Sequence, residues 1–338
     1  MKIKKIGLII VFMSIFGILT ACGETENEEN SAGENGEESG DVTEISFSMD
    51  QPSSHIWVEA MNEFADLAME KTNGSLDITI HDSASLGSQR EALEGMQVGT
   101  MGGTVSVEPI SGFVPEIGIY GVPYLFEDED HLVRFLESES GEELDNLMID
   151  QGFKPLTYFV RDPRQISSNQ EINSLEDMDG MNIRVPESPT APEAFEAMGS
   201  RVVTMPIAEV YSALEQNVID GQENPITQIH SDSFYEVQDY VTISNHQYQA
   251  GYLLISDDIY QSLSEEEQNA LLEAAEEAKT YESELLQEQV DEAYADLEEA
   301  GIEFTEPDTE EFSDAASEAY DNYDEVIQEW IEKVQAEQ

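Results

Sequence analysis

The chain contains few basic residues for its length. Among 338 residues it has 13 lysines and arginines against 74 aspartates and glutamates, which gives a formal net charge of −61. Nucleic acid is excluded as a partner because phosphate binding requires basic patches, and docking to anionic lipid is disfavoured for the same reason. Concentrated salt screens the repulsion between carboxylates. The acidity therefore favours a saline or alkaline extracellular medium; a protein that is simply acidic and soluble is the alternative.

Cysteine is almost absent as well. Cys22 is the only one, so no disulfide can form within the chain. It follows a leader, residues 1–21, in which three lysines precede an apolar run over residues 6–19. This run is too short and wrongly flanked for a stable membrane span, and it is typical of an export signal peptide. The end of the leader, "LTAC", resembles the bacterial lipobox, whose cysteine becomes a lipidated N-terminus.

We therefore expect Cys22 to anchor the protein by a lipid to the outer face of the cell membrane, in the periplasm if the source is Gram-negative. An ordinary secretory signal with an incidental cysteine is the alternative. Residues 22–41 contain no aromatic residue and one β-branched residue, Thr25. Such a segment cannot bury enough apolar surface to fold, and it is interpreted as a disordered acidic tether.

Motifs that would indicate an enzyme or a cofactor are missing too. The sequence has no Walker loop, no dinucleotide-binding glycine loop, no H-E-x-x-H and no G-x-S-x-G. Its five histidines show no metal-ligand spacing, and pairs of carboxylates carry no information in so acidic a chain. We therefore predict a protein that is not an enzyme and that has no cofactor or metal.

Strand and helix patterns alternate along the rest of the chain. The expected strands are 44–49, 75–81, 104–107, 156–160, 181–186, 201–206 and 250–256, and the expected helices include 55–72, 88–99, 190–199 and 264–301. Strands that alternate with helices of this length predict an α/β fold with parallel sheets. The pattern from Ser264 to Gly301 is too long for one small core, so we expect this helix to span two lobes.

Four of the scarce arginines fall within residues 161–201, namely Arg161, Arg164, Arg184 and Arg201. Arginine binds a carboxylate through two parallel hydrogen bonds and stays charged at any relevant pH. Arg184 lies at the C-terminal end of a predicted parallel strand, where open α/β sheets bind their ligands. The pattern fits either a carboxylate site or a surface ion pair with one of the many acids.

Several of these segments together resemble the substrate-binding proteins of TRAP transporters, the DctP type. The resemblance rests on "RQISSNQEINSLEDMDGMNIRVPESP", "AFEAMGSRVVTMPIAEVYSALEQNVIDGQENP" and "FYEVQDYVTISNHQY", with upstream matches in "GSLDITIHDSASLGSQREALEGMQVGT" and "GVPYLFEDEDH". It covers nearly all of residues 43–300. It implies a monomeric extracytoplasmic receptor that captures a small carboxylate-containing solute and delivers it to the membrane subunits of a sodium-driven transporter.

The resemblance also implies a two-lobed periplasmic-binding-protein-like fold, type II-like, whose lobes close over the ligand. Hinge strands and the long helix would join the lobes. Lobe I is expected to comprise residues 42–161 and about 250–289, and lobe II residues 162–249 and about 290–338.

The family's ligand residues fall on Arg184 for the ligand carboxylate, on Arg164 for a second cationic contact and on Asn224 for a neutral hydrogen bond. Ser106 at a strand end and the loop that contains Ser53 are expected to face the cleft from lobe I. Arg161 and Arg201 have no counterpart that we can assign and are interpreted as ion-pair residues. His246 is interpreted as a structural hydrogen-bonding residue.

The resemblance is strongest to the sialic-acid branch, but this chain places Ser106 and Pro109 where that branch has an acid and an arginine. A mono- or dicarboxylate or a sugar acid is therefore favoured over sialic acid. Three other functions stay open: a receptor for an ATP-driven importer, an exported carboxylate-based hydrolase such as a glycosidase, and a surface protein whose acids bind cations. Tight binding without turnover would argue against the hydrolase.

Overall fold

Two β-sheets carry the fold of residues 42–337, which are the residues that the computed structural model describes. The expectations for the leader, for Cys22 and for the tether fall outside the described residues. Within residues 42–337, no helix combines the length and the apolar character that a membrane span requires.

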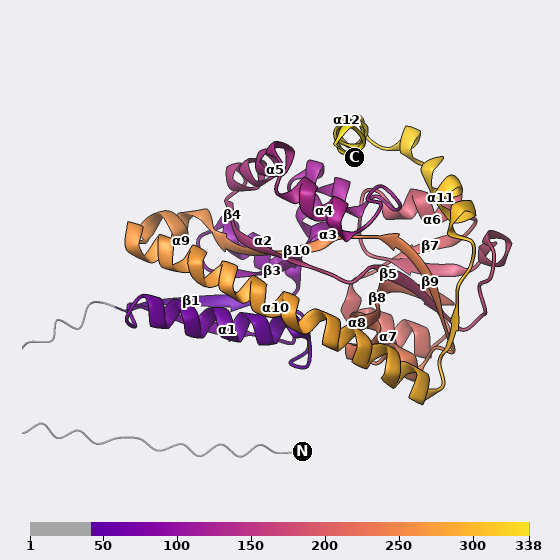
Figure 1. The fold of residues 1–338 in the computed structure, drawn as a ribbon, viewed down its shortest axis with the longest axis horizontal. Helices are drawn as coiled ribbons and strands as arrows, with labels where there is room; N and C mark the ends of the chain where they lie inside the picture. The colour runs from indigo at the N-terminus through magenta and orange to yellow at the C-terminus, as the bar shows by residue number, and fades with distance from the viewer. Residues whose placement is uncertain (1–41, 338) are drawn as a thin grey trace, which may run out of the picture. The chain divides into compact units, whose positions relative to one another are not determined.

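The first sheet has the strand order β2-β1-β3-β10-β4. Figure 1 labels β1, β3, β10 and β4 of this sheet. β1 pairs in parallel with β2 and β3, whereas β10 runs antiparallel to both β3 and β4. The first sheet is therefore mixed, and the prediction of a wholly parallel sheet is wrong. Its strands are β1 (Thr43–Ser48), β2 (Leu76–His81), β3 (Gly102–Ser106), β4 (Phe153–Val160) and β10 (Ala250–Ser256).

The second sheet has the order β11-β9-β5-β8-β6-β7. β6 pairs in parallel with β7 and β8, so Arg184 does lie near the C-terminal end of a parallel strand. β5 runs antiparallel to β8 and β9. The strands are β5 (Arg164–Ser168), β6 (Asn182–Val185), β7 (Arg201–Thr204), β8 (Gly221–Pro225), β9 (Tyr240–Gln247) and β11 (Glu303–Thr305).

Helices connect these strands and pack on both sheets. The α-helices are α1 (Ile56–Lys71), α2 (Gln89–Gln97), α3 (Val107–Ser111), α4 (Glu129–Leu136), α5 (Glu139–Asp150), α6 (Ala191–Ala197), α7 (Ile207–Glu215), α8 (Ile226–Ser231), α9 (Asp257–Ser262), α10 (Glu265–Ala300), α11 (Thr309–Ser317) and α12 (Glu325–Ala336). The 3-10 helices are η1 (Pro115–Gly121), η2 (Leu175–Met178), η3 (Phe234–Glu236) and η4 (Tyr320–Asn322).

The chain passes twice between the sheets in extended form, from β4 to β5 through residues 161–163 and from β9 to β10 through residues 248–249. α10 is the third connection. It begins at a capping box formed by Ser264 and Glu267 and ends at Gly301, which adopts the left-handed conformation that favours glycine (φ 96°). α10 packs against α1 and β4 beside the first sheet and against α8 and η3 beside the second (Figure 1). The prediction of one helix that spans both lobes is confirmed.

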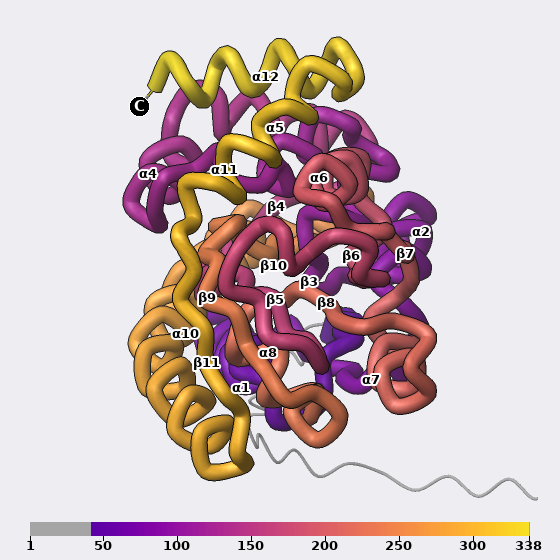
Figure 2. The backbone as a smooth tube through the Cα atoms, turned by 90° about the vertical axis from the view of Figure 1, so that its right-hand side faces the viewer, coloured from indigo at the N-terminus to yellow at the C-terminus, as the bar shows by residue number. Residues whose placement is uncertain are grey.

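A fourth contact comes from the C-terminal segment, which runs from β11 through α11 to α12 (Figure 2). α11 packs against α6, and α12 packs against η1. Lys333 on α12 also pairs with Glu143 on α5 at 2.7 Å. One apolar cluster, which includes Phe153, Ile183 and Trp330, joins the cores beside the two sheets. The lobe boundaries stay a prediction. The contact of α12 with η1 joins a helix of predicted lobe II to a 3-10 helix of predicted lobe I.

Candidate functional site

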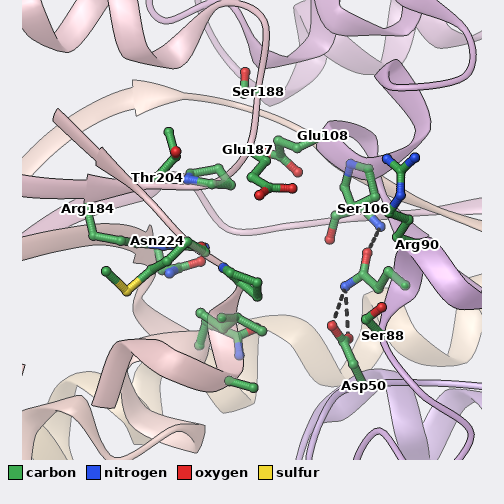
Figure 3. A pocket seen from close by; sticks show the side chains of 18 of the residues that line it. Asp50, Ser88, Arg90, Ser106, Glu108, Arg184, Glu187, Ser188, Thr204 and Asn224 are labelled. Carbon is green, nitrogen blue, oxygen red and sulfur yellow. Dashed lines mark hydrogen bonds between the residues drawn. The ribbon is translucent and has the colours of Figure 1, made fainter. Parts of the chain in front are cut away.

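A cavity of about 880 Å³ lies between residues of the two sheets. Figure 3 shows Ser88, Ser106 and Asp50 on one side and Arg184 and Asn224 on the other. Ser106 is the last residue of β3, and Arg184 is the last but one of β6. The cavity therefore opens at the C-terminal ends of strands, the usual ligand position in α/β sheets.

Arg184 is buried in the cavity wall, with 3% of its surface exposed. Its Nε and Nη2 donate to the backbone carbonyl of Met205 at 3.1 and 2.8 Å. Among residues 42–337, no carboxylate lies within 4.0 Å of its guanidinium. Burial lowers the pKa of Arg184 to about 10, so the group stays cationic at neutral pH. A desolvated cation without a counter-ion is unfavourable unless an anion joins it, so this position is suited to a ligand anion.

Arg164, the first residue of β5, is equally buried but has a partner inside the protein. Its guanidinium donates two hydrogen bonds to the Glu223 carboxylate. Nε donates to Oε2, and Nη2 donates to Oε1 at 2.8 Å. Burial alone would raise the pKa of Glu223, but the Arg164 charge and a hydrogen bond from His246 lower it to about 2. The Nη1 atom faces Glu108 at 4.0 Å. Much of the charge of Arg164 is therefore neutralised before any ligand arrives.

Asn224 follows Glu223 on β8 and lines the cavity beside Arg164. Its Oδ1 accepts from Nη2 of Arg164 at 3.1 Å, and its Nδ2 donates to Oε1 of Gln222 at 2.6 Å. These bonds fix the amide orientation and leave one N–H of Nδ2 for a ligand. Arg184, Arg164 and Asn224, predicted from widely separated motifs, are thus brought to one wall.

Arg161 was interpreted as an ion-pair residue, and that interpretation was wrong. Its side chain lines the cavity with 6% of its surface exposed, and none of its contacts within residues 42–337 is an ion pair. Nη2 donates to Oε1 of Gln228 at 3.1 Å, and the guanidinium lies over the Trp57 ring at 5.1 Å. Arg201 is exposed, and within the described part of the chain it also forms no ion pair.

The opposite wall is formed by the loop after β1, the end of β3 and the start of α2. The backbone N–H of Ser106 donates to Oε1 of Gln89 at 2.7 Å, and Nε2 of Gln89 donates to both carboxylate oxygens of Asp50 at 2.8 and 2.9 Å (Figure 3). Burial raises the pKa of Asp50 to about 6. Ser53 is exposed in the turn after β1 and is not among the cavity-lining residues, whereas Gln51 of the same loop is.

Sequence reasoning missed Arg161, Asp50 and Gln89. Asp50 lies just beyond the C-terminal end of β1, and Gln89 is the first residue of α2. A position just after a strand or at the start of a helix could have indicated that these side chains face the cavity. Asp50 was not recognised as a site residue because acids are so abundant in this chain. Arg161 was not recognised because it was expected to form an ion pair.

His246 is confirmed as a structural residue. It has no exposed surface, and its ring nitrogens lie 2.8 Å from Oγ of Ser244 and 3.2 Å from Oε2 of Glu223. Its contact with Glu223 supports the ion pair behind the cavity. No group of three or more His, Cys, Asp or Glu side chains that could hold a metal ion occurs among residues 42–337.

The sequence matches the family described as "Bacterial extracellular solute-binding protein, family 7", DctP, over residues 47–326. The chain belongs to this family. It is 34% identical over 264 residues to a solute-binding protein of Roseobacter denitrificans, covering 78% of this chain and 81% of that protein. It is also 32% identical over 270 residues to the 2,3-diketo-L-gulonate-binding periplasmic protein YiaO of Escherichia coli, covering 78% of this chain and 80% of that protein.

A solved structure of a TRAP periplasmic solute-binding protein from Roseobacter denitrificans, with bound L-galactonate, superposes on this family member with a TM-score of 0.83. The sequences are 31% identical, and the match covers 87% of this chain and 99% of the other. The predicted resemblance to TRAP-transporter receptors and the predicted two-lobed α/β fold are confirmed. The protein is an extracytoplasmic solute receptor of the TRAP type, and its relatives are receptors and not enzymes, as predicted.

Proposed function

We propose that this family 7 receptor captures a sugar acid and delivers it to the membrane subunits of a sodium-driven TRAP transporter. The main support is the state of Arg184. Its guanidinium is buried in the wall of a cavity of about 880 Å³ and has no carboxylate partner among the described residues. The planar fork of arginine matches a carboxylate. In this proposal Arg184 binds the ligand carboxylate, Nη1 of Arg164 adds a second contact and Asn224 donates a neutral hydrogen bond.

The remaining polar groups of the cavity favour a polyhydroxylated ligand with one carboxylate. Asp50, Glu108 and Asp232 line the same cavity. Carboxylates accept hydrogen bonds from hydroxyl groups but repel a second carboxylate. A sugar acid satisfies both conditions because its charge is confined to one end. The L-galactonate and 2,3-diketo-L-gulonate named for the relatives are compounds of this kind.

The lipid anchor at Cys22 belongs to this proposal too. A receptor tethered by residues 22–41 would stay near its transporter while its folded part exchanges solute. The lipobox resemblance and the position of the chain's single cysteine support it.

The proposal is tested by a thermal-shift and calorimetry screen of the purified protein with sugar acids, neutral sugars and dicarboxylates. A ligand that binds the folded state raises the melting temperature by mass action. We expect L-galactonate or D-glucuronate to bind and neutral sugars to bind far more weakly. Preference for succinate over every sugar acid would contradict the proposed substrate class, and turnover of a ligand would contradict the receptor role.

A further inference from the structure

Arg161 is a second buried cation, and it forms no ion pair with any residue between 42 and 337. It lies in the crossover between β4 and β5, and its backbone N–H donates to the carbonyl of Gln249 in the other crossover at 3.0 Å. Its guanidinium is held by two groups without net charge, the indole of Trp57 from α1 and the amide of Gln228 from α8. These contacts orient the group, but they do not neutralise its charge.

The acids near Arg161 accept hydrogen bonds from neutral groups and not from its guanidinium. Asp162 accepts from the backbone and hydroxyl of Thr227 at 3.3 and 2.6 Å. Asp50 is held by Gln89, and Oδ2 of Asp232 accepts from Nε2 of Gln228 at 2.5 Å.

A third acid, Glu108, is also engaged elsewhere. Its Oε1 accepts from Gln249 at 3.1 Å. Burial and the neighbouring Arg164 charge lower the pKa of Arg161 to about 10, so the group is still protonated at neutral pH. Glu108, Asp162 and Asp50 attract this charge, but among residues 42–337 no carboxylate lies within 4.0 Å of the Arg161 guanidinium. A ligand anion would therefore be its first direct counter-ion.

We propose that Arg161 is a further ligand-binding and specificity-determining residue, which shares the negative charge of the bound acid with Arg184. This inference rests on the proposed function of the cavity. Arg161 and Arg184 are both buried, both line the cavity and both have no carboxylate partner within residues 42–337. Arg164, in contrast, is neutralised by Glu223.

A ligand anion bound to Arg161 would also affect Trp57, which lies against the guanidinium. Trp57 belongs to α1 beside the first sheet, and Gln228 belongs to α8 beside the second. A Cβ atom on Gly251 would lie 2.1 Å from the Trp57 ring, so the indole is pressed against β10 and has little freedom. A ligand anion on Arg161 therefore contacts a side chain that both halves of the cavity hold in place, and it changes the electrostatic field at Trp57.

The test compares wild type, Arg161→Met, Arg161→Lys and the exposed control Arg201→Met. Calorimetry measures the affinities for L-galactonate, D-glucuronate and D-galacturonate. Competition experiments at millimolar concentration measure the affinities for the neutral compounds L-galactono-1,4-lactone and D-glucose. We expect Arg161→Met to weaken binding of the acids by about thirtyfold to several thousandfold, the range for loss of one partner of a buried charge pair. The neutral compounds should change less than threefold (roughly 0.6 kcal/mol), Arg161→Lys should fall between, and Arg201→Met should match wild type.

Fluorescence gives an independent readout. In a Trp330→Phe background, Trp57 is the remaining tryptophan, and acid binding should shift its emission when Arg161 is present but not in Arg161→Met at saturating ligand. Equal weakening of acids and neutral compounds would show that Arg161 only positions the fold, and it would overturn the inference. Binding of the acids by Arg161→Met within threefold of wild type would do the same. If wild type bound none of the acids, the proposed function itself would fail, and the inference with it.

Discussion

Arg164, which lines the cavity, forms a buried ion pair with Glu223, and 3% and 1% of their side chains are exposed. Arg184 lines the same cavity, and within residues 42–337 its guanidinium bonds only to a backbone carbonyl. Two arginines carried over from the same family pattern therefore have different electrostatic states. One is part of the protein's own charge balance, and the other is free to accept an anion.

Arg184→Ala should weaken binding of the best acid in the screen by about thirtyfold to several thousandfold. Loss of one partner of a desolvated charge pair costs roughly 2–5 kcal/mol. Arg184→Lys should lose much of this affinity too, because an ammonium cannot reproduce the planar fork. Calorimetry measures both, with the exposed Arg201→Ala as control. A folded Arg184→Ala protein that bound the acid within threefold of wild type would contradict the site assignment.

Arg164→Met should destabilise the ligand-free protein by about 3–5 kcal/mol, because it leaves the Glu223 carboxylate buried without its arginine partner. Glu223→Gln in the same chain should recover part of this loss. Arg184→Met, which breaks no ion pair among the described residues, is the matched control and should change the free energy of unfolding much less. Urea unfolding without ligand measures all three. Equal destabilisation by the two arginine variants would show that loss of the ion pair does not account for the change in the free energy of unfolding.

The same ion pair should make stability depend on acid pH. The pKa of Glu223 is lowered from 4.5 to about 2 in the folded protein. Its contribution is therefore present above about pH 4.5 and is lost as the pH falls toward 2. The difference in unfolding free energy between wild type and Glu223→Gln should shrink over that window. A difference that stayed constant would contradict the lowered pKa.

Glu282 on α10 should have the opposite effect. Its side chain is 1% exposed, Oε1 has no hydrogen-bond partner among the described residues, and burial raises its pKa from 4.5 to about 8. The folded state then holds a proton that the unfolded state has released, so stability falls as pH rises from 4.5 to 8, by at most about 1.4 kcal/mol per unit. Glu282→Gln should remove this slope. Urea titrations at several pH values compare the two proteins, and parallel curves would refute the assignment.

Cys22→Ser should release the protein from the membrane fraction or leave its leader unprocessed, if Cys22 carries the anchor. Membrane fractionation and mass spectrometry of the mature N-terminus measure the outcome. Wild-type membrane retention of the variant would reject the lipid anchor and would leave the receptor function untouched.

Some features followed from the sequence because they depend on local order along the chain. The helix from Ser264 to Gly301 has a capping box, an apolar pattern and a terminal glycine, and it forms as predicted. Arg184 reaches the cavity because a short β-strand determines on which face and at which end its side chain lies. The scarcity of arginine made this residue conspicuous.

The sequence by itself thus determined the receptor family, the long connecting helix and the wall formed by Arg184, Arg164 and Asn224. Only the tertiary structure decided which arginines are neutralised. Glu223 meets Arg164 because β5 and β8 pair antiparallel, and Arg161 meets Trp57 where the chain crosses between the sheets. Ion pairing depends on distances between atoms that are far apart in sequence. In a chain with 74 acids, no spacing along the sequence shows which carboxylate lies within reach of a given guanidinium.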